Sequence, residues 1–202
     1  MSWQNLVLSF FLRKRLKPFL SRALEVEHVR ELVSRPMWKP RAPLGWRVRQ
    51  TTEPPKGEWI ERDTGASNPE AGRTLLYLHG GGYFFCSPET HRPITFRLGP
   101  GAGARSFVPD YRLAPEHRFP AAVEDAVAAY RHLRDAGTPA SRIVIAGDSA
   151  GGGLALAMLV ALRDAGEALP AGAVLFSPWT DLACTGGSLV TNDGSDVMFH
   201  GD

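Results

Sequence analysis

The stretch IVIAGDSAG, residues 143–151, gives the clearest indication of the fold. A run of apolar, mostly β-branched residues leads into a glycine–serine–glycine spacing, and an Ala- and Leu-rich segment begins at once at Ala150. This G-x-S-x-G pattern is typical of a sharp turn between a strand and a helix, where small residues at Gly147 and Gly151 let the backbone bend. The hydroxyl of Ser149 would then stand exposed at the carboxyl edge of a sheet.

The segments around this turn alternate between strand-like and helix-like patterns. Short apolar runs predict strands at 74–78, 105–108, 142–146 and 172–176, and longer Ala-rich runs predict helices at 121–133 and 150–165. Two further β-like runs lie at 45–50 and 58–62, and the interval between the strands at 74–78 and 105–108 is predicted to be a loop. Continuous apolar strands that alternate with helices indicate a mostly parallel sheet covered on both faces. The sequence therefore predicts an α/β fold.

The composition is that of an ordinary globular protein. The chain has 202 residues, of which 44% are hydrophobic and 22% charged, and its net charge of +2 is too balanced to favour a nucleic-acid partner. Cys86 and Cys184 lie far apart, with no partner at metal-ligand spacing. This excludes a disulfide scaffold and a zinc finger, and it indicates a reducing, cytoplasmic compartment. We expect no metal and no cofactor.

The charge is unevenly distributed along the chain. Residues 1–50 contain eleven Lys and Arg but three acidic residues, a net charge of +8. Apolar residues recur there at helical spacing (Trp3, Leu6, Val7, Phe10 and Phe11), before basic residues at 13–17, and a second helical stretch covers 20–33. That order is wrong for a signal peptide, and the apolar run is too short to span a bilayer. These segments are interpreted as helices that pack on the main domain, or alternatively as a peripheral membrane contact.

A second motif, His79-Gly80-Gly81-Gly82, directly follows the predicted strand at 74–78. Consecutive glycines leave backbone N–H groups free to point at one site, because no side chain blocks the approach of a substrate. Donors placed where an oxyanion develops stabilise the transition state of acyl transfer. A plain glycine turn and a phosphate-binding loop are the alternatives, but the chain contains no G-x-x-x-x-G-K-[ST] sequence. The motif therefore favours an oxyanion-binding loop.

Several stretches of the chain resemble the hormone-sensitive-lipase family of α/β-hydrolases. They are LLYLHGGGYFFCSPETH (75–91), DYRLAPE (110–116), IVIAGDSAGGGLA (143–155) and SPWTDL (177–182). The resemblance runs from about Arg47 to Leu182. It implies an α/β-hydrolase fold and the hydrolysis of short- to medium-chain carboxylic esters through a serine acyl-enzyme. The implied partner is a small-molecule ester.

The resemblance also implies roles for the residues of the two motifs. Ser149 would be the nucleophile, and the N–H groups of Gly81, Gly82 and Ala150 would form the oxyanion hole. His79 would organise its loop and would not be the base. The other residues that support the motifs are Gly80, Gly147, Asp148 and Gly151.

Two regions follow from the same resemblance. Residues 1–45 would be N-terminal cap helices over the active site. Residues 46–202 would be a partial α/β-hydrolase core, incomplete at its C-terminal side, with a second cap segment beginning after residue 182.

A serine hydroxyl needs a base oriented by a third group, and in this fold the acid and then the histidine follow the serine along the chain. Only one predicted strand follows Ser149, and the only histidine after it is His200. We therefore expect an N-terminal fragment that lacks the triad Asp and His. A triad of Ser149 with His200 and one of Asp181, Asp193 or Asp196 is an alternative, as is a non-catalytic remnant of a hydrolase.

Overall fold

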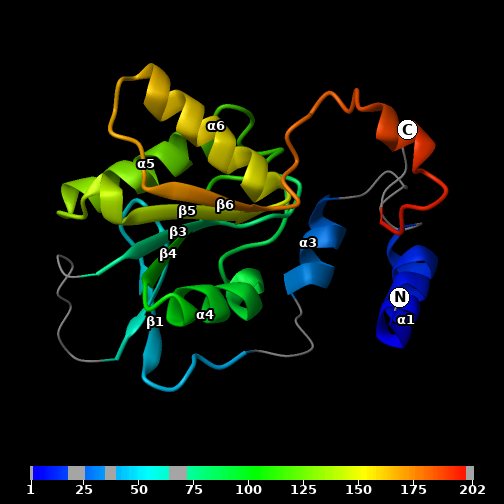
Figure 1. The fold of residues 1–202 in the computed structure, drawn as a ribbon, viewed down its shortest axis with the longest axis horizontal. Coiled ribbons are helices and arrows are strands. Elements are labelled where there is room, and N and C mark those ends of the chain that lie inside the picture. Colours follow the sequence, from blue (N-terminus) through cyan, green and yellow to red (C-terminus); the bar gives the residue numbers. More distant parts are fainter. Residues whose placement is uncertain (1, 18–25, 35–39, 64–71, 199–202) are drawn as a thin grey trace. The chain divides into compact units, whose positions relative to one another are not determined.

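The computed structural model describes residues 2–17, 26–34, 40–63 and 72–198, and the chain divides into two compact units. The larger unit, Val33–Thr180, contains a six-stranded sheet within the described residues (Figure 1). Its strands are β1 (Trp46–Thr51), β2 (Gly57–Arg62), β3 (Thr74–Leu78), β4 (Arg105–Pro109), β5 (Ile143–Asp148) and β6 (Gly172–Phe176). These strands confirm the predicted α/β fold, and each lies within two residues of its expected limits.

The strands are ordered β1-β2-β4-β3-β5-β6 across the sheet, so that β3 lies in its interior, between β4 and β5. The strands β4, β3, β5 and β6 are parallel, whereas β2 pairs antiparallel with both β1 and β4. In the β3–β5 ladder Leu78 lies opposite Gly147. Both strands therefore end at the same edge of the sheet, and the two motifs that follow them begin side by side.

Helices cover both faces of the sheet. The helices α5 (Ala121–Asp135) and α6 (Ala150–Asp164) lie on one face, and α4 (Arg92–Gly101) lies on the other (Figure 1). On α6 the buried residues Leu154, Ala155, Met158 and Leu162 recur at helical spacing, so that one stripe of the helix packs into the core beneath the sheet. Short 3₁₀ turns precede α4 and β5, at η2 (Glu89–His91) and η3 (Ala140–Arg142).

The prediction of a loop between β3 and β4 was wrong, because this interval contains α4. The segment RPITFRLGPG is rich in residues that disfavour helices, so its sequence does not predict the helix that forms. Pro93 lies in the first turn, where its missing N–H costs nothing, and Pro100 lies in the last. Gly99 is required by packing, because a Cβ there would lie 2.1 Å from Ser106 Oγ on β4.

The smaller unit comprises residues 1–32 and 181–202. Its described elements are α1 (Trp3–Phe11), the π-helical turn η1 (Leu12–Leu16), most of α3 (Val26–Ser34) and α7 (Gly187–Thr191). The Lys17 ammonium donates hydrogen bonds to the carbonyl oxygens of Asp193 and Asp196, which ties the end of the first helical segment to the C-terminal turn. Of the second predicted helix, at 20–33, residues 20–25 lie outside the described residues.

The apolar residues of α1 are exposed, Trp3 by 71% and Phe10 by 67%. In the described part of the chain, no helix has the length and apolar character needed to cross a membrane. The two interpretations of the N-terminal segment, a cap and a membrane-surface helix, both remain predictions, as does the domain division at residue 45.

The last strand of the sheet, β6, is paired with β5 along one side only within the described residues. Two of its apolar side chains, Val174 and Phe176, are 49% and 41% exposed. They help to line an apolar hollow of about 190 Å³ on the α4 face, together with Leu75 and Ala146 of the neighbouring strands. An unpaired edge beside apolar surface favours association between chains.

We therefore expect this chain to associate at high concentration, and Val174→Lys to reduce that association by placing a charge on the edge strand. Val160→Lys on α6 is the matched control, because Val160 is exposed to a similar extent, 46%, but lies on a helix. Sedimentation velocity over a concentration series measures the effect. A wild-type chain that stays a clean monomer throughout would contradict the expectation.

Candidate active site

Ser149 lies in a strained turn between β5 and α6. Its backbone dihedrals are φ 51° and ψ −121°, a conformation that costs a non-glycine residue about 1–3 kcal/mol. Two backbone hydrogen bonds outside the helix hold it: Ser149 N–H donates to Phe176 O (2.9 Å), and Trp179 N–H donates to Ser149 O (2.8 Å). The turn expected from G-x-S-x-G is therefore present, and it is fastened to β6 and the loop that follows.

The flanking glycines allow α6 to approach the end of β3 closely. A Cβ on Gly151 would lie 2.1 Å from Leu78 O and 2.4 Å from His79 O, and one on Gly147 would lie 2.5 Å from Gly151 O. Real side chains do not tolerate such distances to backbone atoms. Both glycines are therefore required by packing at this turn, as the motif predicts.

The glycine loop after β3 makes a tight turn. Gly81 and Gly82 have φ values of +115° and +58°, and Gly81 O accepts hydrogen bonds from the N–H groups of Phe84 and Phe85, both at 3.0 Å. A Cβ on Gly81 would lie 2.1 Å from Phe85 O, so this position has no room for a side chain. The loop starts at the same edge of the sheet as the serine turn, because β3 and β5 are neighbours.

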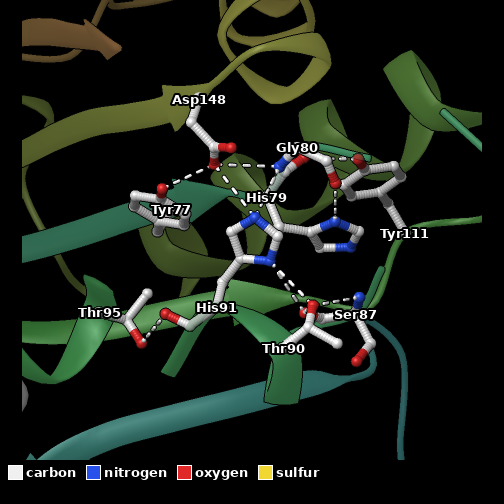
Figure 2. Close-up of polar contacts among 9 residues, drawn as sticks. All are labelled: Tyr77, His79, Gly80, Ser87, Thr90, His91, Thr95, Tyr111 and Asp148. Carbon is white, nitrogen blue, oxygen red and sulfur yellow. Dashed lines mark hydrogen bonds and ion pairs between the residues drawn. The ribbon is translucent and has the colours of Figure 1, made fainter. Parts of the chain in front are cut away.

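His79 is fully buried and packs within this loop (Figure 2). Its ring stacks on Tyr111 with centroids 4.2 Å apart, and Nδ1 lies 2.8 Å from Gly80 O, to which a neutral ring donates its proton. The Tyr111 hydroxyl donates to His79 O at 2.7 Å. Burial is the main cause that lowers the pKa of His79 to about 3, so the ring is neutral in the folded protein. These contacts favour a structural role for His79.

The buried neutral ring predicts acid sensitivity. Because the folded pKa of His79 is about 3 and the ordinary value is 6.5, the unfolded chain binds one more proton between these two pH values. The free energy of unfolding should therefore fall as the pH drops below 6.5, by up to about 1.4 kcal/mol per pH unit. Between pH 7 and pH 5, urea unfolding should show a loss about 2 kcal/mol smaller in His79→Asn. The exposed His117→Asn serves as control, and an equal loss in His79→Asn and wild type would refute the assignment.

Asp148, the residue before the serine, joins the two motifs. Its Oδ1 accepts hydrogen bonds from the Tyr77 hydroxyl (2.7 Å) and the Gly80 N–H (3.0 Å), and His91 Nε2 lies 3.4 Å away (Figure 2). Burial acts to raise the pKa of Asp148, but contacts with His91, Tyr77 and the Gly80 N–H together lower it below its usual value. Burial and the carboxylate both raise the pKa of Tyr77, which is therefore a donor at neutral pH. Sequence analysis did not find the roles of Tyr77 and His91.

Aromatic side chains flank the loop and the serine turn. Tyr83, Phe84 and Phe85 are half-buried, and the rings of Phe84 and Phe85 pack edge to face at 4.8 Å. The ring centroids of Tyr83 and Trp179 are 6.3 Å apart, and the backbone N–H of Trp179 donates to Ser149 O. This places apolar surface next to the turn that carries the serine.

No histidine is hydrogen-bonded to Ser149 Oγ among the described residues, and His200 lies outside them. The candidate acids after the serine have local partners in the smaller unit. The carboxylate of Asp181 accepts hydrogen bonds from Ala183 N–H (3.1 Å) and from Thr185 (2.7 and 2.9 Å), and Asp193 forms an ion pair with Lys17 at 3.5 Å. The base and the acid of the predicted triad stay predictions.

Comparison with known families agrees with this arrangement. Residues 75–199 match the sequence profile of a family described as having the alpha/beta hydrolase fold. The matched span is more than half of the chain and includes both motifs. The chain therefore belongs to this family of α/β-hydrolases.

Three individual proteins are similar to this chain. An acetyl-hydrolase of Streptomyces hygroscopicus is 58% identical over 127 residues, which is 63% of this chain and 42% of that protein. The crystal structure of EstE5 soaked with p-nitrophenyl butyrate superposes with a TM-score of 0.86 and 40% identity, covering 98% of this chain and 65% of that one. An esterase of the bacterial hormone-sensitive lipase family gives a TM-score of 0.84 and 39% identity, covering 99% and 65%. The chain is thus an α/β-hydrolase similar to esterases of the hormone-sensitive lipase family, and it spans less than two thirds of the length of these relatives.

Proposed function

We propose that this chain carries the nucleophile and the oxyanion hole of a carboxylic ester hydrolase. The observation that carries the proposal is the strained turn at Ser149, which begins beside the His79–Gly82 loop at one edge of the sheet. Strain of this kind persists only where the surrounding structure enforces it, and it is concentrated at functional sites. A serine presented on such a turn next to free backbone N–H groups is the arrangement that acyl transfer requires.

In the proposed reaction, Ser149 Oγ attacks the carbonyl carbon of the ester and loses its proton to a base. The carbonyl oxygen becomes an oxyanion, which accepts hydrogen bonds from the N–H groups of Gly81, Gly82 and Ala150. Ala150 is the first residue of α6, so the partial positive charge of the helix N-terminus adds to this stabilisation. The alcohol leaves with a proton from the base, and water then hydrolyses the acyl-enzyme.

The base is a separate part of the proposal. We assign it, with its acid, to residues beyond those of this chain, because the solved relatives have additional sequence that this chain does not cover. The alternative is His200 with one of Asp181, Asp193 or Asp196. If Asp181 or Asp193 is that acid, the bonds that now engage its carboxylate would have to be exchanged for contacts with the histidine.

Short acyl esters are the proposed substrates. The name of the Streptomyces relative, acetyl-hydrolase, and the p-nitrophenyl butyrate used with EstE5 support this choice. The half-buried rings of Tyr83, Phe84 and Phe85 would supply an apolar wall for the acyl or alcohol group.

A fluorophosphonate probe tests the proposal directly, because it reacts with an activated serine and leaves ordinary hydroxyls alone. We expect one label per chain at Ser149, located by peptide mass spectrometry, in whichever form of the protein contains the base. Ser141→Ala, an exposed serine before β5, should leave labelling unchanged. Labelling at another serine, with Ser149 unmodified, would overturn the assignment of the nucleophile.

A further inference from the structure

Three segments of the larger unit meet at one oxygen atom of Asp148 (Figure 2). Tyr77 comes from the end of β3, Gly80 from the loop that follows it, and His91 from the 3₁₀ turn before α4. Their donor or acceptor atoms lie 2.7, 3.0 and 3.4 Å from Oδ1. Asp148 itself directly precedes Ser149, so that this single carboxylate connects the serine turn with the glycine loop.

The contact between Gly80 and Asp148 continues the β3–β5 pairing beyond the strands. The last pair of this ladder is Leu78 with Gly147, and the next link between the two segments is the bond from Gly80 N–H to Asp148 Oδ1. The fit is close, because a Cβ on Gly80 would lie 2.3 Å from Asp148 Oδ2. The carboxylate therefore sets how near the start of the loop lies to the residue before the serine.

His91 supports the same contact from the other side. The Thr90 hydroxyl donates to Ser87 O at 2.8 Å, so its remaining lone pair faces His91 Nδ1 at 3.0 Å. This arrangement assigns the proton of a neutral His91 ring to Nδ1. Nε2 is then free to accept from Gly80 N–H at 3.3 Å, whereas a protonated ring would donate from Nε2 to Asp148. In the neutral ring Nε2 shares the Gly80 N–H with Asp148 Oδ1, and in the protonated ring it donates to Oδ1, so that His91 lies against this contact in either state.

We propose that Asp148 is a positioning residue that holds the Gly80–Gly82 loop at its working distance from Ser149, with Tyr77 and His91 fixing its carboxylate. The proposal rests on the proposed function, because it takes the N–H groups of Gly81 and Gly82 as oxyanion donors. Such donors act most strongly in the transition state. Loss of the carboxylate should therefore lower kcat and leave KM nearly unchanged.

The test compares Asp148→Ala and Asp148→Asn with Tyr77→Phe. Asparagine keeps one oxygen that can accept from Gly80 N–H, so it should rescue part of what alanine loses. Tyr130→Phe is the matched control for Tyr77→Phe. Tyr130 is also a buried tyrosine whose hydroxyl donates a hydrogen bond, in its case to Ala168 O, and it belongs to the opposite face of the sheet.

Two measurements are made on each folded variant. Hydrogen–deuterium exchange of the peptide 79–86 reports the loop without any need for activity, and it should be about tenfold faster in Asp148→Ala, the factor expected from one lost hydrogen bond to a charged group. Hydrolysis of p-nitrophenyl acetate, in whichever form of the protein catalyses it, should show kcat about 10²-fold lower in Asp148→Ala. Asp148→Asn and Tyr77→Phe should lie between Asp148→Ala and wild type, and Tyr130→Phe should match wild type in both measurements.

The outcomes separate this proposal from the proposed function. A folded Asp148→Ala whose loop exchanges as slowly as wild type would overturn the positioning role. If the alanine variant does not fold, exchange as slow as wild type in both Asp148→Asn and Tyr77→Phe would overturn it. Faster exchange with unchanged kcat would leave the positioning role intact and overturn the assignment of Gly81 and Gly82 to the oxyanion hole. If no form of the protein hydrolyses esters, the proposed function fails, and the exchange rates still decide the role of Asp148.

Discussion

Ser149→Ala is expected to lower turnover of p-nitrophenyl acetate by about 10⁶-fold in the form of the protein that hydrolyses it. The reason is that the hydroxyl forms the covalent bond to the acyl group, and the other groups of the site cannot replace it. In serine proteases, removal of the nucleophile has an effect of about this size, and a residual acceleration of about 10³–10⁴ over water comes from the oxyanion hole and binding. Initial rates with purified protein measure the change.

The fold should survive this substitution, because Ser149 is held by backbone hydrogen bonds that alanine also makes. The thermal midpoint of Ser149→Ala should therefore equal that of wild type, and Ser141→Ala provides the matched control for both activity and stability. Wild-type turnover in a folded Ser149→Ala variant would show that the nucleophile lies elsewhere.

The second large effect concerns the base. Under the proposed assignment of the base to residues outside this chain, residues 1–202 alone should be close to inactive on p-nitrophenyl acetate and butyrate. A longer form of the protein that contains the proposed base should be faster by about 10⁶-fold, the approximate effect of a catalytic histidine in serine proteases. Assay of the two lengths side by side, at equal concentration of folded protein, measures this ratio.

The His200 alternative predicts the opposite. Residues 1–202 would then show substantial turnover, and His200→Ala would remove it. His117→Ala is the matched control, because it removes an exposed histidine that precedes the serine in the chain. Robust hydrolysis by residues 1–202 that depends on His200 would prove the assignment of the base to additional sequence wrong.

The sequence predicted the parts of this molecule that depend on local pattern. Apolar runs located the strands, and the glycines of the two motifs located turns whose geometry leaves no room for a Cβ at Gly81, Gly147 or Gly151. Helix α4 was missed because its local preferences oppose the helix, which is stabilised by packing of Phe96 and Gly99 against the sheet. Tertiary contacts outweighed propensity there.

The contacts of Asp148 could not be predicted for a different reason. Tyr77, Gly80 and His91 reach Asp148 only because β5 lies next to β3 while α4 packs on the opposite face from α6, and no local pattern specifies that order. His91 lies twelve residues after His79, and this spacing belongs to no motif that would distinguish it from a surface histidine. Its role appears only when segments 57 residues apart, at His91 and Asp148, are brought together by the sheet.

The position of β3 between β4 and β5 has a consequence for biosynthesis. Both neighbours of β3 are made after it, and β5 begins only at Ile143, long after Thr74 has left the ribosome. At about 5–20 residues per second, the strand waits roughly 3–14 s for its second partner. During this interval TLLYL, which is wholly buried in the folded unit, is open to other chains. We expect the yield of folded protein in cells to depend on holding chaperones and on the rate of translation more than on the final stability of the fold.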